Sequence, residues 1–405
     1  MRFETATRAA GLARLEAFIP RMGKRYAAGR NFDLGPERHL DVSGLSPFLR
    51  RRLVLEEEVV EAALAAHGAE GAEKFLQEVA WRGYFKGWLE HRPAIWTRYR
   101  DGLSQDLTAL ERDRALRREL ARAEAGQTGI ACFDAWAQEL VETGYLHNHA
   151  RMWFASIWIF TLGLPWRLGA DFFYRHLLDG DPASNTLSWR WVAGLHTRGK
   201  FYEAKAWNIA KFTGQRFLPR DAELAVVTKG LEDTEPEGLP PGTPLRAPSA
   251  MAEGLPSLLL LTEEDCGLRA AELADWSLSG CLALEVSHLR SHRDVADAVA
   301  GFERAALEDA AARLGLDVQI KRAGDARDLA RWAKACGARQ VITGFVPRGP
   351  LRDWLDEAQL ALTAEGIALC EWQRPWDAAL WPHATAGFFK VKKALPRILG
   401  QRQLI

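Results

Sequence analysis

The stretch that decides the fold of this chain opens at Thr143 with TGYLHNHARM and closes over residues 179–191 with DGDPASNTLSWRW. Between the two lies the very apolar run MWFASIWIFTLGL, residues 152–164. This run is shorter than the roughly 18 residues expected of a membrane-spanning helix, so it predicts a buried helix. A soluble domain rarely surrounds such a helix with so many polar and aromatic side chains for stability alone, and we therefore expect a functional site here.

Three further segments belong to the same pattern: EVAWR at residues 78–82, SGLSPFL at residues 43–49, and Tyr26 followed by Arg30 and Asn31. Together these segments resemble the photolyase and cryptochrome family, whose motifs ExxWR, SxLSPxL, TGxxHNxxRM and DGDxAxNxxxWxW line a flavin. The resemblance implies that the chain binds FAD.

The chain divides by composition. Residues 1–220 show helical periodicity, for example in 53–66, 75–88 and 133–142. Residues 232–256 are rich in Pro, Gly, Glu and Ser, which is typical of a linker. Beyond it, short apolar runs at 257–262, 281–286, 317–320, 340–343 and 367–371 alternate with helical stretches such as 295–314. This alternation predicts a doubly wound, largely parallel sheet.

The predicted fold class is therefore α plus α/β in two domains: a helical FAD-binding domain at 1–225, a linker at 226–254, and an α/β domain at 255–405. The second half resembles the α/β domain that photolyases usually carry at their N-terminus, including the closing GFFKV at 387–391. The resemblance thus implies a permuted domain order. Residues 262–269 lack the family's FRxDLR motif, so the sequence predicts no particular antenna chromophore.

The resemblance assigns the flavin contacts residue by residue. Arg151 and Asp179 form a pair beside the ring, Asn185 faces its N5 atom, and Asp181 belongs to the same loop. The other cofactor-binding positions are Tyr26, Ser43, Gly44, Leu45, Ser46, Trp81, Arg82 and Asn148. Two simpler interpretations stay open, since Arg151 and Asp179 can form a structural ion pair and asparagine is a common helix cap.

The resemblance also implies a substrate site for a flipped cyclobutane pyrimidine dimer, with Glu78, Trp81, Asn148, Met152 and Trp191 as its catalytic and binding residues. Relatives that repair 6-4 photoproducts place a histidine where this chain has Asn148, because they need a proton donor. Asparagine cannot supply a proton, so this position favours cyclobutane dimers. The alternative is that Trp81 and Trp191 are core aromatics.

An electron relay to the flavin is the third expectation, with Trp189 and Trp166 as inner members and Trp96 or Tyr99 as the outer one. Packing alone can also bring these rings together. Besides the missing FRxDLR motif, two further departures from the family pattern are His149, where repair enzymes commonly have arginine, and residues 201–209, which replace a YFRIFNP-type segment.

These observations predict a light-driven lyase that binds damaged DNA, single- or double-stranded, and a cryptochrome-like photosensor is the alternative. Residues 1–220 contain 32 Lys and Arg against 26 Asp and Glu, a surplus of six that suits a polyanion. No secretory signal or metal motif is visible, so we expect a cytoplasmic monomer without a metal.

Overall fold

The computed structural model describes residue 3 and residues 5–404. The chain folds into two compact units that interleave along the sequence. Unit 1 comprises residues 1–3, 24–43 and 92–242, and unit 2 comprises 4–23, 44–91 and 243–405. The units do not coincide with the three consecutive segments expected from composition, because residues 44–91 group with the second half of the chain.

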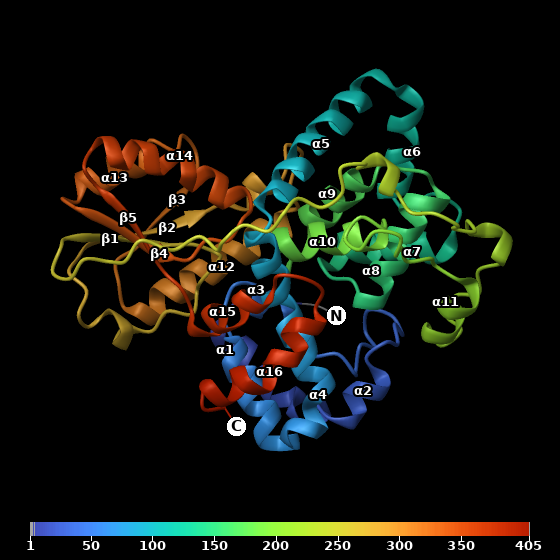
Figure 1. Cartoon of the computed structure of the whole chain (residues 1–405), viewed down its shortest axis with the longest axis horizontal. Helices are drawn as coiled ribbons and strands as arrows, with labels where there is room; N and C mark the ends of the chain where they lie inside the picture. Colours follow the sequence, from blue (N-terminus) through green and yellow to red (C-terminus); the bar gives the residue numbers. More distant parts are fainter. Residues whose placement is uncertain (1–2, 4, 405) are drawn as a thin grey trace. The chain divides into compact units, whose positions relative to one another are not determined.

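Unit 1 is helical, as the periodicity predicts (Figure 1). Among its described residues the helices are α2 (Lys24–Gly29), α5 (Pro93–Arg112), α6 (Arg114–Glu124), α7 (Ala131–Thr143), α8 (Asn148–Ser156), α9 (Trp166–His176), α10 (Pro182–Val192) and α11 (Ala206–Phe212). Short 3-10 turns lie at Asp221–Glu223 and Glu232–Thr234.

The apolar run is helical as far as Thr161 and buried over residues 153–159, but it is not one regular α-helix. After α8 the chain continues as a π-helical turn over Ile157–Thr161. Trp153, Phe154 and Trp158 are fully buried there. Gly163, with φ of 64°, follows the turn and lets the chain reverse toward α9.

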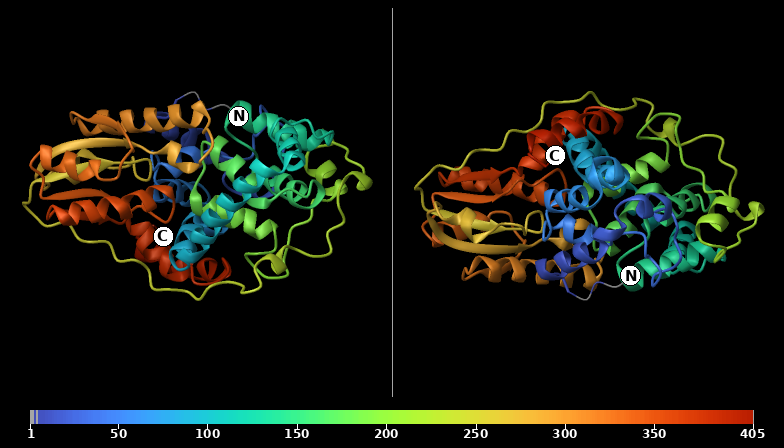
Figure 2. Two further views of the ribbon diagram at one scale, coloured as in Figure 1. Left: turned by 90° about the horizontal axis from the view of Figure 1, so that it is seen from above. Right: turned by 90° about the horizontal axis from the view of Figure 1, so that it is seen from below.

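Unit 2 contains a five-stranded parallel sheet in the order β3-β2-β1-β4-β5. The strands are β1 (Ser257–Leu261), β2 (Leu278–Glu285), β3 (Gln319–Arg322), β4 (Gln340–Gly344) and β5 (Ala368–Trp372). Helix α12 (Asp297–Leu314) lies on one face, and α13 (Asp328–Ala335) and α14 (Pro350–Ala364) lie on the other (Figures 1 and 2). The predicted doubly wound α/β architecture is confirmed.

The remaining elements of unit 2 are mostly helical. They are α1 (Arg8–Phe18), α3 (Ser46–Arg50), α4 (Glu56–Glu90), α15 (Pro375–Leu380) and α16 (Phe389–Gln401), with 3-10 turns at Ile19–Arg21, Ala270–Leu273, Ser287–Arg290 and Trp381–His383. Helix α4 is interrupted at Gly68, whose φ is 64° and ψ is 172°. Among the described helices of both units, none has the length and apolar character needed to cross a bilayer.

Buried ion pairs explain why residues 44–91 belong with the sheet. Arg50 lies 3.1 Å from Glu263 and 2.7 Å from Glu264, and Lys86 lies 3.0 Å from Glu264. These side chains are at most 6% exposed, and buried charges of this kind are tolerated only when they are paired. The acidic segment after β1, at residues 262–269, which replaces the family's FRxDLR motif, thus links α3 and α4 to the sheet through ion pairs.

Candidate flavin and substrate site

The start of α8 is set by local chemistry. Gly144, with φ of 66°, ends α7 in the left-handed conformation that favours glycine. His147 is the N-cap of α8, and its Nδ1 atom accepts a hydrogen bond from the backbone N–H of His149 at 3.2 Å. Asn148 is therefore the first residue of the helix and is exposed, whereas Arg151 and Met152, one turn later, are half-buried. All three predicted residues remain accessible to a ligand.

Arg151 and Asp179 form the predicted pair. The Arg151 Nη2 atom donates to Asp179 Oδ2 at 2.9 Å, and Arg151 Nε donates to the carbonyl of Leu146 at 2.8 Å. The arginine side chain is 22% exposed and the aspartate 4%. The guanidinium also lies 5.5 Å from the centre of the Tyr145 ring. The cation is thus held in place while part of it stays accessible.

Helix α10 is capped by Asp181, not by Asn185. The Asp181 Oδ1 atom accepts from the backbone N–H of Ser184 at 2.8 Å, and Pro182 occupies the first helical position. Asn185 lies inside the helix, and its Nδ2 group donates to the carbonyl of Ala170 at 2.7 Å. The helix-cap interpretation of Asn185 is therefore wrong, and its amide is oriented by α9.

The two tryptophans of α10 have different surroundings. Trp189 is 2% exposed, and its ring is nearly perpendicular to those of Trp158 and Phe173, at 6.1 and 5.1 Å between centres. Gly169 makes this packing possible, because a Cβ atom there would come within 2.3 Å of the Trp189 ring. Trp191 is half-buried, and its ring lies 5.6 Å from that of Tyr202.

A row of buried aromatic rings includes the predicted outer relay members. Trp96 and Tyr99 lie 5.5 Å apart between ring centres, and Tyr99 and Trp166 lie 5.7 Å apart. Each of the three is at most 5% exposed. Burial raises the pKa of the Tyr99 hydroxyl well above its ordinary value. Tyr99 thus lies between Trp96 and Trp166, an arrangement that the sequence left open.

The predicted residues of unit 2 lie on α3 and α4. Trp81 is half-buried and stacks on Phe388, with 3.9 Å between ring centres and 11° between planes. Arg82 donates from Nη2 to the carbonyl of Ser46 at 3.3 Å, which joins the ExxWR segment to the SxLSPxL segment. Glu78 lies three residues before Trp81 on α4 and is half-buried.

The turn before α3 has the backbone that the motif requires. Gly44 has φ of 61°, and Leu45, the N-cap position of α3, is fully buried. Ser46 begins the helix and is half-buried. In unit 1, Ser43 is half-buried and Tyr26, on α2, is 8% exposed.

The predicted residues are divided between the units. Unit 2 contains Gly44, Leu45, Ser46, Glu78, Trp81 and Arg82, and unit 1 contains Tyr26, Ser43, Trp96, Asn148, Arg151, Met152, Trp166, Asp179, Asp181, Asn185, Trp189 and Trp191. Within unit 1 the structure brings together Arg151 with Asp179, and within unit 2 Arg82 with Ser46. Sequence reasoning missed Phe388 as the stacking partner of Trp81, because no spacing rule relates residues so far apart.

Comparison with known proteins identifies the region that carries these motifs. Residues 75–216 match the family described as the FAD binding domain of DNA photolyase. Through this region, the chain is similar to the FAD-binding domain of DNA photolyases. The predicted cofactor, FAD, agrees with this description of the family.

Photolyases of several bacteria match part of the chain. The deoxyribodipyrimidine photo-lyase of Streptomyces griseus is 38% identical over 39% of this chain and 34% of its own length. One from Thermus thermophilus is 36% identical over 46% of this chain and 42% of its own length. The chain thus spans between a third and a half of the length of these photolyases.

The crystal structure of a bacterial class III photolyase from Agrobacterium tumefaciens is 29% identical, with a TM-score of 0.41, over 51% of this chain and 43% of the other.

The chemistry of the side chains in unit 1 fits a flavin. A reduced flavin ring carries negative charge, which a fixed cation nearby stabilises. Arg151 is held by two hydrogen bonds, and part of its side chain remains accessible. The ring also needs an oriented amide, and Asn185 uses its Nδ2 group on Ala170. Its Oδ1 atom accepts none of the hydrogen bonds found among the described residues, so this oxygen can accept a hydrogen bond from a ligand.

Proposed function

We propose that this protein is a light-driven, FAD-dependent enzyme that repairs cyclobutane pyrimidine dimers in DNA. The observation that carries the proposal is the family match of residues 75–216, because the Arg151–Asp179 pair and the oriented Asn185 amide lie in that region. FAD, when bound and reduced, would supply an electron to the lesion after light absorption. The protein's own part is to hold the ring, exclude water and position the lesion.

Each group of residues has a role in this proposal. Arg151 would face the ring as a fixed cation, and Asp179 would orient its guanidinium. Asn148, exposed at the start of α8, would donate amide hydrogen bonds to the lesion bases. Met152, one turn further along α8, would pack beside them.

The family resemblance assigns Trp191 and Trp81 to stacking on the flipped bases, and Glu78 to accepting hydrogen bonds from the base edges. Flipping costs a few kcal/mol, less for a damaged pair, and stacking returns about 1–3 kcal/mol per base. Ser43, Gly44, Leu45 and Ser46 would contact the pyrophosphate of FAD at the start of α3. The lesion preference rests on Asn148, since an amide cannot act as a proton donor in the manner of histidine.

We also propose that the domain order is permuted relative to photolyases, with the α/β domain after the helical domain. The five parallel strands lie between residues 257 and 372, and the region that matches the FAD-binding family ends at residue 216. Rearrangement of this kind is tolerated because domain termini tend to lie at the surface.

The test is dimer loss under blue light. Anaerobic, fully reduced protein is mixed with an oligothymidylate that carries cyclobutane dimers, and recovery of thymine absorbance is followed in light and in the dark. We expect recovery in light only. Glu78→Ala, at a position assigned to the lesion and not to the cofactor, should still bind FAD and still photoreduce, yet repair far more slowly. No dimer loss with fully reduced wild-type protein would reject repair, and light-dependent photoreduction without it would favour the photosensor alternative.

A further inference from the structure

Trp207 is unusual among the tryptophans of this protein. It is 62% exposed, and it is the one tryptophan among the strongly exposed large apolar side chains of the described residues. Tryptophan is highly buried on average, because its large ring contributes so much to a core. An indole ring that lies in water on a short helix therefore needs an explanation.

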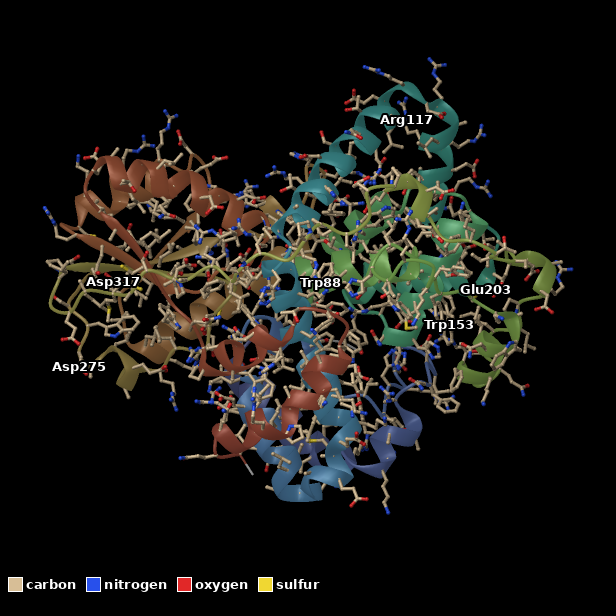
Figure 3. The ribbon with its side chains drawn as sticks, viewed as in Figure 1. Trp88, Arg117, Trp153, Glu203, Asp275 and Asp317 are labelled. Carbon is tan, nitrogen blue, oxygen red and sulfur yellow. The ribbon has the colours of Figure 1, made fainter. Side chains whose placement is uncertain are left out.

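The position of α11 is well defined, so the exposure of Trp207 does not arise from a loose helix. The next residue, Asn208, accepts a hydrogen bond on Oδ1 from the indole Nε1 of buried Trp153 at 3.0 Å. Ala206 and Ile209, at 7% and 0% exposed, form the inner face of α11. Figure 3 labels Trp153 and Glu203 in this part of unit 1. With its neighbours directed inward, Trp207 points to solvent.

The segment around Trp207 is strongly basic. Residues 198–220 contain six Lys and Arg and one acidic residue, Glu203. Lys205 pairs with Glu203 at 3.2 Å, and Arg220 pairs with Glu223 at 2.8 Å. Arg198, Lys200 and Lys211, all exposed, form no ion pair among the residues that the structure describes. Lys211 lies four residues after Trp207, so the two share one face of α11.

This surface adjoins the residues that the proposed function assigns to the lesion. The Phe212 ring, at the end of α11, lies 5.1 Å from that of His149, the neighbour of Asn148. On the other side, the backbone N–H of Tyr202 donates to the carbonyl of Val192 at 3.1 Å, and the Tyr202 ring lies against Trp191. The surface of α11 is therefore continuous with α8 and with the end of α10.

We infer that Trp207 stacks on an unpaired base of a DNA strand next to the lesion, while Lys211 and Lys200 contact its phosphates. An exposed aromatic ring beside a lysine without an ion pair, in a basic segment, is the combination that binds single-stranded nucleic acid, because every base has a face to stack and every phosphate a charge to neutralise. The inference rests on the proposed function for the choice of DNA. It adds a strand contact outside the lesion site.

The experiment measures binding in the dark. Fluorescence anisotropy of a labelled 16-residue oligothymidylate, single-stranded and without dimers, is titrated with wild-type protein and variants over a series of salt concentrations. Trp207→Ala should weaken binding roughly 5- to 150-fold, and Trp207→Phe, which keeps a stacking ring, should restore most of it. Lys211→Gln should reduce the slope of log K against log salt by about 0.7.

Two controls isolate the surface. Lys229→Gln removes an exposed lysine, paired with Asp233 outside this segment, and should leave affinity within twofold of wild type. Equal thermal unfolding of Trp207→Ala and wild type shows that the variant is folded. The inference is overturned if Trp207→Ala binds the oligonucleotide as wild type does, if wild type does not bind it, or if the substitution alters only self-association.

The inference and the proposed function fail separately. Repair of a dimer in a bare thymine dinucleotide tests the lesion site without a flanking strand, so it should be unchanged in Trp207→Ala. Loss of FAD binding or of dinucleotide repair in wild type would count against the proposed function, while oligonucleotide affinity would still decide the role of Trp207.

Discussion

The Nε2 atom of His149 lies 3.3 Å from the hydroxyl of Tyr202, and this contact joins two of the three places at which the sequence departs from the family pattern. His149 Nδ1 lies 2.9 Å from the carbonyl oxygen of Asn31, which can only accept, so Nδ1 carries the proton. The Tyr202 hydroxyl therefore donates to Nε2. Because the Tyr202 ring also packs against Trp191, the two departures act together to support one predicted lesion contact.

The first prediction concerns this contact. Tyr202→Phe keeps the ring and removes the hydroxyl, and it should lower the free energy of unfolding by about 1 kcal/mol, as expected for one hydrogen bond. Chemical denaturation measures the change. In a His149→Ala background, Tyr202→Phe should lower the free energy of unfolding by clearly less, because the Nε2 acceptor is already absent. An equal cost in both backgrounds would show that the bond contributes nothing.

The second prediction concerns Arg151 and Asp179. Arg151→Met should destabilise the protein by about 3 kcal/mol, because it leaves the 4% exposed Asp179 carboxylate without its cation. Arg151→Met combined with Asp179→Asn should recover much of this loss, and both proteins should bind FAD more weakly than wild type. Denaturation and flavin absorbance after gel filtration measure the two effects. Full FAD retention in the single variant would contradict a role for Arg151 at the ring.

The third prediction concerns the aromatic row. Trp166→Phe should slow photoreduction of oxidised flavin at least tenfold if Trp166 carries electrons, since phenylalanine is much harder to oxidise. Tyr99→Phe should slow it only if the path runs through Tyr99 between Trp166 and Trp96. Phe160→Leu, a change of an aromatic ring outside the row, serves as the control. Blue-light bleaching with an external reductant gives the rates.

The fourth prediction concerns pH. Burial lowers the pKa of His147 to about 3. The negative charge of Asp33 acts in the opposite direction, and the nearby basic groups His39, His149 and Arg151 lower this pKa further. The unfolded chain, with a histidine pKa near 6.5, binds this proton more readily than the folded chain. The contribution of neutral His147 to the free energy of unfolding is therefore complete above pH 6.5. It is lost as pH falls toward 3, by up to about 1.4 kcal/mol per pH unit.

The matched variant is His147→Asn, which can still cap α8 but cannot titrate. Denaturation between pH 4.5 and 7.5 should show a shallower loss of stability in this variant than in wild type. Burial also lowers the pKa of His149, so some pH dependence should remain. Identical slopes for variant and wild type would show that His147 does not remain neutral.

Much of the secondary structure could be predicted from local pattern. All five strands of the sheet and α12 fall within a few residues of their expected positions, because alternation of short apolar runs with amphipathic helices is a local signal. The division into units could not be predicted in the same way. Residues 44–91 belong with the sheet through the pairs of Arg50 and Lys86 with Glu263 and Glu264, and such pairing between distant residues leaves no periodic trace.

The sequence by itself determined which residue types stand in the flavin motifs, because their order and spacing are properties of the chain. Only the tertiary structure decided how side chains distant in sequence serve one another: Asn185 donates to Ala170 rather than capping α10, His149 accepts from Tyr202, and Phe388 covers a face of Trp81. The physical reason is that a hydrogen bond or a stacked pair depends on distance and direction in space, which folding sets and sequence spacing does not.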